Sequence, residues 1–244
     1  TSKGGSDWND IQVMEIKTGK MLPDVVKWTK FSGIAWYKDG FFYSAYNVKD
    51  EKKALSTKNE FHKVYYHKLG TSQAKDILIY ENKDFPLRNY GVFLDEDEKY
   101  MFLSESESTS GNALWMRAAG TSNAKWTKIA DGFEYDYSFI GVVDGKIYIL
   151  TNNDAPNNRL ISVDPSNPGV SSWRNVIPES ENVLQSVSYI NKRLVVNYLQ
   201  DASDRIYIYS ADGKMEKQID LPGIGTLGGP SGNRNEPVFF YSYT

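Results

Sequence analysis

The sequence repeats itself at a fixed spacing. The segment GTSQAK at residues 70–75 returns as GTSNAK at residues 120–125, and each copy follows a run typical of a strand, VYY at 64–66 and LWM at 114–116. A period of about 40 to 50 residues built from short strands is typical of a β-propeller blade. We therefore predict an all-β propeller. Any functional site should lie in loops at the propeller faces or in the central channel.

Composition supports one large all-β domain and excludes several kinds of site. The chain has 244 residues, and 14% of them are aromatic, a content that suits half-buried strands. It has no cysteine, which excludes disulfides, thiolate metal sites and a cysteine nucleophile. A formal net charge of -3 and the lack of an apolar run near 18 residues give no reason to expect nucleic acid or a membrane as partner.

Turn signals and alternation divide the chain into regular groups of four strands. First strands are expected at 31–36, 90–94, 138–142, 184–189 and 224–228, and second strands at 41–45, 100–104, 146–150, 193–198 and 238–243. Turns such as Asp39-Gly40 and Asp144-Gly145 favour tight hairpins between them. Third strands should begin near Ile11, Val64, Leu114, Leu160 and Ile206, and fourth strands near Met21, Ile77, Trp126, Trp173 and Glu216.

This count predicts four complete four-stranded blades over residues 31–222, with an outer half blade over 1–30 and an inner half blade over 223–244. We expect the two halves to pair, strand 11–16 with strand 238–243, and to close a five-bladed ring. Closure would leave no unpaired strand edge. The alternative is an open arc cut from a larger propeller.

The residues that hydrolytic chemistry needs are missing from the sequence. An α/β-hydrolase carries its nucleophile in Gly-x-Ser-x-Gly, and no such segment occurs. The two histidines, His62 and His67, flank one expected strand five residues apart, so they should face opposite sides and hold structural or surface roles. We therefore predict no catalytic residue, no metal site and no cofactor in this chain.

Several longer segments resemble one known family. They are GSDW at 5–8 followed by Ile11, KFSGIAW at 30–36, GFFYSAY at 40–46, HKVYYHKLGT at 62–71 and DAPNNRL at 154–160. Together they resemble the propeller domain of the prolyl oligopeptidase (prolyl endopeptidase) family, and the resemblance runs over essentially the whole chain.

The resemblance implies that substrate exclusion and catalysis belong to different domains. Members of that family are serine peptidases that cut short peptides after proline. A seven-bladed propeller covers the active site of their α/β-hydrolase domain and excludes large folded substrates. This chain then corresponds to part of the propeller and should be catalytically silent alone. Its expected partners are the hydrolase domain of the parent chain and short proline-containing peptides.

The resemblance also points to particular residues. Phe31 matches a family phenylalanine that reaches into the specificity region, although inter-blade packing would also explain it. Asn89 and Thr109 stand where some members place a methionine and a cysteine near that pocket, and so depart from the pattern. The segment 47–61 matches a loop that faces the hydrolase domain. Its charged residues are expected to form a mobile gate, or else an ordinary variable surface loop: Lys49, Asp50, Glu51, Lys52 and Lys53.

Two other functions compete with this interpretation. A five-bladed glycoside hydrolase would need paired carboxylates on channel-facing strands, and the expected first strands contain almost no Asp or Glu. A stand-alone propeller that binds carbohydrate or peptide would usually repeat one pocket in each blade, whereas these blade loops differ. The compartment stays open between bacterial periplasm and cytoplasm, and the exported forms among similar proteins favour the periplasm.

Overall fold

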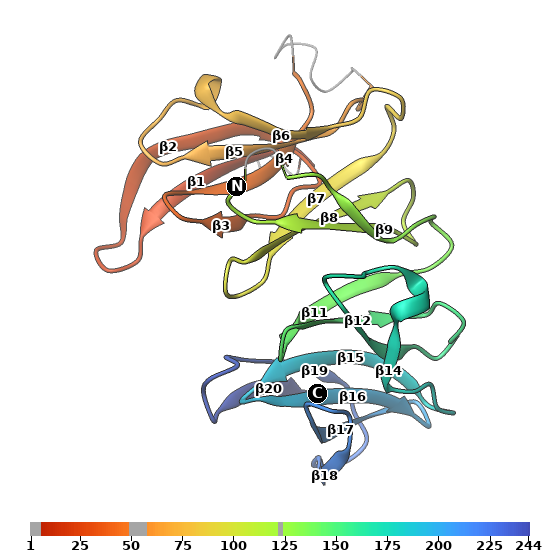
Figure 1. Ribbon diagram of the computed structural model, residues 1–244. Coiled ribbons are helices and arrows are strands. Elements are labelled where there is room, and N and C mark those ends of the chain that lie inside the picture. Colours follow the sequence, from red (N-terminus) through yellow and green to blue (C-terminus); the bar gives the residue numbers. More distant parts are fainter. Residues whose placement is uncertain (1–5, 49–57, 122–123) are drawn as a thin grey trace. The chain divides into compact units, whose positions relative to one another are not determined.

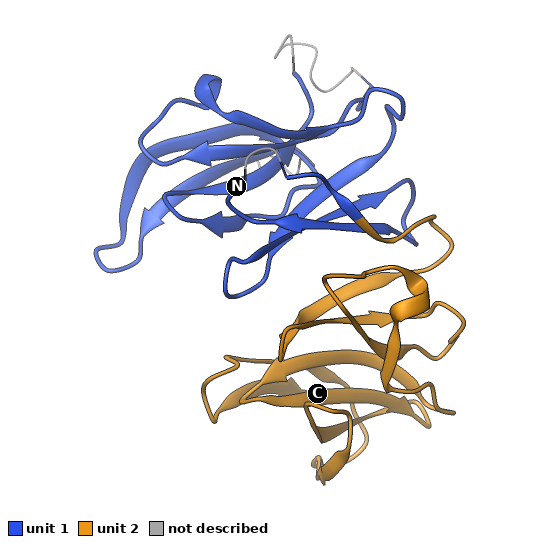
Figure 2. Cartoon of the chain, in the orientation of Figure 1, with its two compact units in different colours: residues 1–127 blue, residues 128–244 orange. Residues whose placement is uncertain are grey.

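The computed structural model describes residues 6–48, 58–121 and 124–244. These residues form antiparallel strands and two single-turn 3-10 helices, η1 (Gln73–Lys75) and η2 (Val170–Ser172). No helix in these ranges has the length and apolarity needed to cross a bilayer. The chain divides into two compact units, residues 1–127 and 128–244 (Figure 2), and each is described by itself.

Unit 1 begins with a strand pair joined to a four-stranded meander (Figure 1). The backbone pairing between the strand pair and the meander is a single residue pair, Thr29↔Ala45. The whole sheet has the order β1-β2-β4-β5-β6, and β3 pairs with β4. Its strands are β1 (Asn9–Glu15), β2 (Lys20–Thr29), β3 (Ala35–Tyr37), β4 (Gly40–Ala45), β5 (Lys63–Lys68) and β6 (Ile77–Glu81).

The remaining sheets are regular. A four-stranded sheet of order β10-β9-β8-β7 follows in the chain, and unit 2 adds two four-stranded sheets and one strand pair. The strands are β7 (Asn89–Leu94), β8 (Tyr100–Ser106), β9 (Ala113–Ala118) and β10 (Thr127–Ala130); β11 (Tyr137–Val143), β12 (Lys146–Thr151), β13 (Arg159–Val163) and β14 (Arg174–Ile177); β15 (Val183–Ile190), β16 (Arg193–Gln200), β17 (Ser203–Ser210) and β18 (Met215–Ile219); and β19 (Leu227–Gly232) with β20 (Phe239–Tyr243).

The hydrophobic core of each unit lies between consecutive sheets. In unit 1, Val64 of β5, Tyr90 of β7 and Leu103 of β8 form one cluster, and all three are almost fully buried. In unit 2, Leu160 and Leu194 belong to a larger cluster that joins β11–β14 to β15 and β16. Apolar side chains that alternate along half-buried strands produce this packing, because successive residues of a strand point to opposite faces.

The prediction of an all-β chain made of four-stranded antiparallel sheets is confirmed. Two expected strand boundaries were wrong. The strand predicted at 31–36 begins only at Ala35, and the one predicted at 224–228 begins at Leu227 and runs through Pro230 to Gly232. The five-bladed ring, and the assignment of 1–30 and 223–244 as halves of one blade, stay predictions.

Candidate functional site

Phe31 lies in the connection between β2 and β3 with an exposed ring. Phe31 is 62% exposed. Its backbone has a φ of 53°, a left-handed conformation that non-glycine residues rarely adopt. The Lys30 ammonium lies 5.2 Å from the centre of this ring and 3.3 Å from a carboxylate oxygen of Asp7. An aromatic side chain held in solvent by a strained backbone is a feature that recurs at functional sites.

His62 connects the Phe31 segment to β7. The His62 side chain is fully buried; Nε2 lies 3.0 Å from the Lys30 carbonyl oxygen, and Nδ1 accepts the Tyr90 backbone N–H at 2.9 Å. One nitrogen must therefore donate and the other accept, which is the neutral imidazole with its proton on Nε2. Burial lowers the pKa of His62 to about 4, in agreement with that form.

Asn89 and Thr109 lie at one end of the second sheet. Asn89 opens β7 opposite Ser106 of β8, and its Oδ1 accepts the Tyr46 hydroxyl at 2.5 Å. Thr109 is exposed in the turn between β8 and β9. The structure thus links the Phe31 segment to Asn89 through His62 and Tyr90, and it places Thr109 three residues beyond the strand position that faces Asn89.

An ion pair fixes the backbone beside Asn89. Arg88 Nη1 lies 2.9 Å from Glu105 Oε1, and Arg88 Nε donates to Glu107 Oε1 at 2.6 Å. The Glu105 side chain is only 4% exposed and also accepts the Trp115 indole N–H at 3.2 Å. Charge-assisted bonds of this kind are stronger than neutral ones. The sequence analysis did not identify this arrangement.

The five charged residues of the expected gate, Lys49, Asp50, Glu51, Lys52 and Lys53, lie outside the described residues. The gate therefore stays a prediction.

The second histidine belongs to a separate buried cluster. His67 Nδ1 lies 2.8 Å from Asp76 and Nε2 lies 3.2 Å from Asp24, and all three side chains are at most 3% exposed. Both ring nitrogens face carboxyl oxygens, so the imidazole bridges the two acidic side chains. Tyr43 donates to the second Asp76 oxygen at 2.8 Å, and burial together with that contact raises the pKa of Tyr43. The cluster ties β2, β5 and the start of β6 together, which is a structural role.

Within the described ranges, the two histidines have no hydrogen-bond partner in common. Among the described residues there is also no group of three or more His, Asp or Glu side chains arranged to hold a metal ion.

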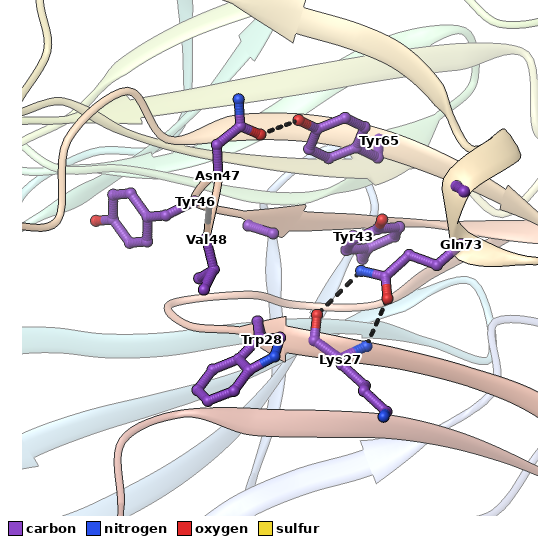
Figure 3. Close-up of a pocket in the computed structure, with 10 residues that line it drawn as sticks. Lys27, Trp28, Tyr43, Tyr46, Asn47, Val48, Tyr65 and Gln73 are labelled. Carbon is purple, nitrogen blue, oxygen red and sulfur yellow. Dashed lines mark hydrogen bonds between the residues drawn. The ribbon is translucent and has the colours of Figure 1, made fainter. Parts of the chain in front are cut away.

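A cavity of about 450 Å³ opens in unit 1 between β2, β4, β5 and η1 (Figure 3). Four of its ten lining residues are aromatic: Trp28, Tyr43, Tyr46 and Tyr65. No local sequence pattern indicates it, because these residues come from three strands and from the segment after β4, and each alone resembles an ordinary strand residue. The only local signal was the density of aromatic residues in this part of the chain.

Comparison with known proteins gives one consistent result. The family model for the prolyl oligopeptidase N-terminal β-propeller domain matches residues 1–244. The prolyl endopeptidase of Elizabethkingia meningoseptica is 36% identical over 244 residues, which are all of this chain and 34% of that protein. Prolyl oligopeptidase A of Amanita bisporigera is 32% identical over 236 residues, which are 91% of this chain and 31% of that protein.

Solved structures agree with these sequence matches. Apo prolyl oligopeptidase B from Galerina marginata superposes with a TM-score of 0.87 at 29% identity, over 100% of this chain and 36% of that one. The same enzyme bound to a 35mer hydrolysis and macrocyclization substrate gives 0.85 at 29% identity, over 97% of this chain and 35% of that one. The chain spans about a third of the length of the curated relatives it matches.

Proposed function

Since the chain belongs to the prolyl oligopeptidase family, as a stretch of the N-terminal β-propeller domain, we propose that it filters and gates substrates for a serine endopeptidase that cleaves short peptides after proline. The observation that carries the proposal is the match of the whole chain to the propeller of proteins named prolyl endopeptidases. The catalytic serine and its partners belong, in this proposal, to an α/β-hydrolase domain of the same polypeptide. The 244-residue chain then has no peptidase activity of its own.

Phe31 is the residue we assign to peptide contact. Its ring is exposed, and its position is fixed by Lys30 and by the His62 hydrogen bond to the Lys30 carbonyl. An exposed ring can bury apolar surface against a peptide side chain, a gain of about 1.5 to 3 kcal/mol when burial is complete. Asn89 and Thr109 supply polar groups near the same end of the sheet, and the segment that carries Lys49 to Lys53 is the proposed gate.

The test measures kcat/KM of the full-length protein and its variants on a chromogenic peptide in which proline directly precedes the cleaved bond. Phe31→Ala should lower kcat/KM about tenfold, because part of that burial energy is lost from the transition-state complex. Phe240→Ala is the matched control, since Phe240 is 71% exposed on β20 in the other unit, and it should leave kcat/KM unchanged.

Two results would contradict the proposal. Turnover of the chromogenic peptide by the isolated 244-residue chain would show that catalysis does not need the α/β-hydrolase domain. Equal kcat/KM for proline and alanine at the cleaved bond in the full-length protein would remove the proline specificity.

A further inference from the structure

Aromatic side chains line opposite sides of the cavity between β2, β4, β5 and η1. Figure 3 shows Trp28 on one side and Tyr65 with Asn47 on the other. Tyr43 also lines the cavity and stacks on Tyr65, with ring centres 5.6 Å apart and planes 23° apart. A volume of about 450 Å³ is within the range of sites that hold small molecules or a few residues of peptide.

The walls are held in place before any ligand arrives. Trp8 packs edge-on against Trp28, with ring centres 5.8 Å apart. The Tyr65 hydroxyl donates to Asn47 Oδ1 at 2.9 Å, which fixes both side chains. Gln73 closes one end, because its amide accepts the Lys27 backbone N–H at 2.9 Å and donates to the Lys27 carbonyl at 3.0 Å. A preorganised site loses less side-chain entropy when it binds.

Trp28 itself is strained. Its φ is 61°, in the left-handed region, although it lies within β2 and is not glycine. Such conformations cost of order 1 to 3 kcal/mol and concentrate at ligand sites. The strain and the cavity are independent observations on the same residue.

Two hydrogen-bond donors of this lining are unused within the described part of the chain. Neither the Trp28 indole N–H nor the Asn47 side-chain NH₂ has a hydrogen-bond partner among the residues that the structure describes. The Gln73 amide, in contrast, is used by Lys27. A ligand that fits must therefore bring acceptors and apolar bulk.

We infer that this cavity binds a proline-rich peptide segment in the polyproline II conformation. Proline residues have carbonyl acceptors but no backbone N–H, which complements the two unused donors of Trp28 and Asn47. Pyrrolidine rings pack well between Trp and Tyr faces, and aromatic-lined grooves are a general way to recognise polyproline II segments. The peptide also binds with a small entropy loss because this conformation is already populated in solution.

The binding claim stands on the cavity alone and goes beyond the proposed function, in which peptide contact is assigned to Phe31. The two sets of residues are adjacent, because Tyr46 lines the cavity and its hydroxyl donates to Asn89. A segment held here would belong to the same proline-containing peptide that the proposed enzyme cleaves.

The test measures fluorescence anisotropy of a labelled ten-residue polyproline peptide with the 244-residue chain. Saturable binding is expected, and a Gly-Ser peptide of equal length should not bind. Trp28→Phe keeps an aromatic wall and removes the N–H, so Kd should rise about three- to tenfold. Trp28→Ala removes the wall, so Kd should rise more than tenfold.

Trp36→Phe and Trp36→Ala are the matched controls. Trp36 is a tryptophan of the same unit, 55% exposed on β3 and outside the cavity lining, and its variants should bind like the parent chain. If Trp28→Ala does not fold, Asn47→Ala provides the second variant, because Asn47 is exposed and lies outside the strands; it should raise Kd at least threefold.

The inference is overturned if polyproline gives no saturable signal at millimolar protein, if the Gly-Ser peptide binds equally, or if the Trp28 and Asn47 variants bind like the parent chain. None of these results bears on proline-specific cleavage by the full-length protein. Loss of cleavage in that protein would likewise leave peptide binding by this chain intact.

Discussion

Acid should destabilise unit 1 through one residue, His62. The folded chain holds this side chain neutral, since Nδ1 must accept from Tyr90 while burial opposes the charge. Its pKa is lowered from 6.5 to about 4. A histidine whose pKa is lower in the folded than in the unfolded state does not lower the free energy of unfolding at pH values above its unfolded pKa. Its cost to stability grows as the pH falls from 6.5 to 4.

The magnitude follows from the size of the shift. Each pKa unit corresponds to about 1.4 kcal/mol, so the whole shift is worth about 3 kcal/mol at saturation. At pH 5 the unfolded histidine is almost fully protonated and the folded one is mostly neutral. The free energy of unfolding should then be about 2 kcal/mol lower than at pH 8 from this residue alone.

Urea unfolding of the chain and of His62→Gln, at several pH values between 5 and 8, isolates the effect. Glutamine keeps one donor and one acceptor but does not titrate. Tryptophan fluorescence reports mainly on unit 1, because five of the six tryptophans lie in residues 1–127. The variant should be less stable at pH 8, since it loses the packing of the ring against Tyr46 at 4.6 Å, but its pH dependence should be shallower by about 2 kcal/mol.

The carboxylates and His67 are identical in both proteins, so their contributions cancel in the difference. Parallel curves of unfolding free energy against pH for the two proteins would refute the reasoning. They would mean that His62 is not held neutral in the folded chain.

Two further changes should reduce stability, and urea unfolding measures both. His67→Phe keeps a ring of similar size but leaves two buried carboxyl groups, Asp24 and Asp76, without their imidazole partner, and it should cost about 2 to 6 kcal/mol; a loss below about 1 kcal/mol would contradict the structural role of this cluster. Gly213→Ala would place Cβ 1.9 Å from the Val176 carbonyl oxygen at a φ of 88°, and it should cost more than about 2 kcal/mol, whereas Gly169→Ala meets nothing within 4 Å and should be nearly neutral. Equal effects of the two glycine changes would contradict the steric argument.

The repeat and the alternation of apolar residues predicted most strands, because turn chemistry and period-two burial are local signals. The two wrong boundaries have different physical causes. The strand expected to start at Phe31 is shortened because the backbone turns left-handed there and Ser32 Oγ takes the Ser44 N–H. The strand at Leu227 extends through Pro230, which is possible because β19 pairs with β20 alone in its sheet.

The candidate site was less predictable than the fold. Resemblance predicted roles for Phe31 and Asn89. His62, which bonds the backbone of the residues next to them, was predicted only to have a structural or surface role. Its role depends on the meeting of two segments 28 and 32 residues away, which no local pattern encodes. The same holds for the cavity at Trp28, whose walls come from separate strands.

The side-chain amide of Gln73, in η1, makes the two hydrogen bonds that a neighbouring strand would otherwise make to Lys27. It accepts the Lys27 backbone N–H and donates to the Lys27 carbonyl. Every residue type except proline can make a backbone ladder, so such a ladder tolerates drift in sequence. A junction that depends on a side chain is different, because one codon change can weaken or restore it. The attachment of the N-terminal strand pair can therefore be adjusted by natural variation without altering any strand.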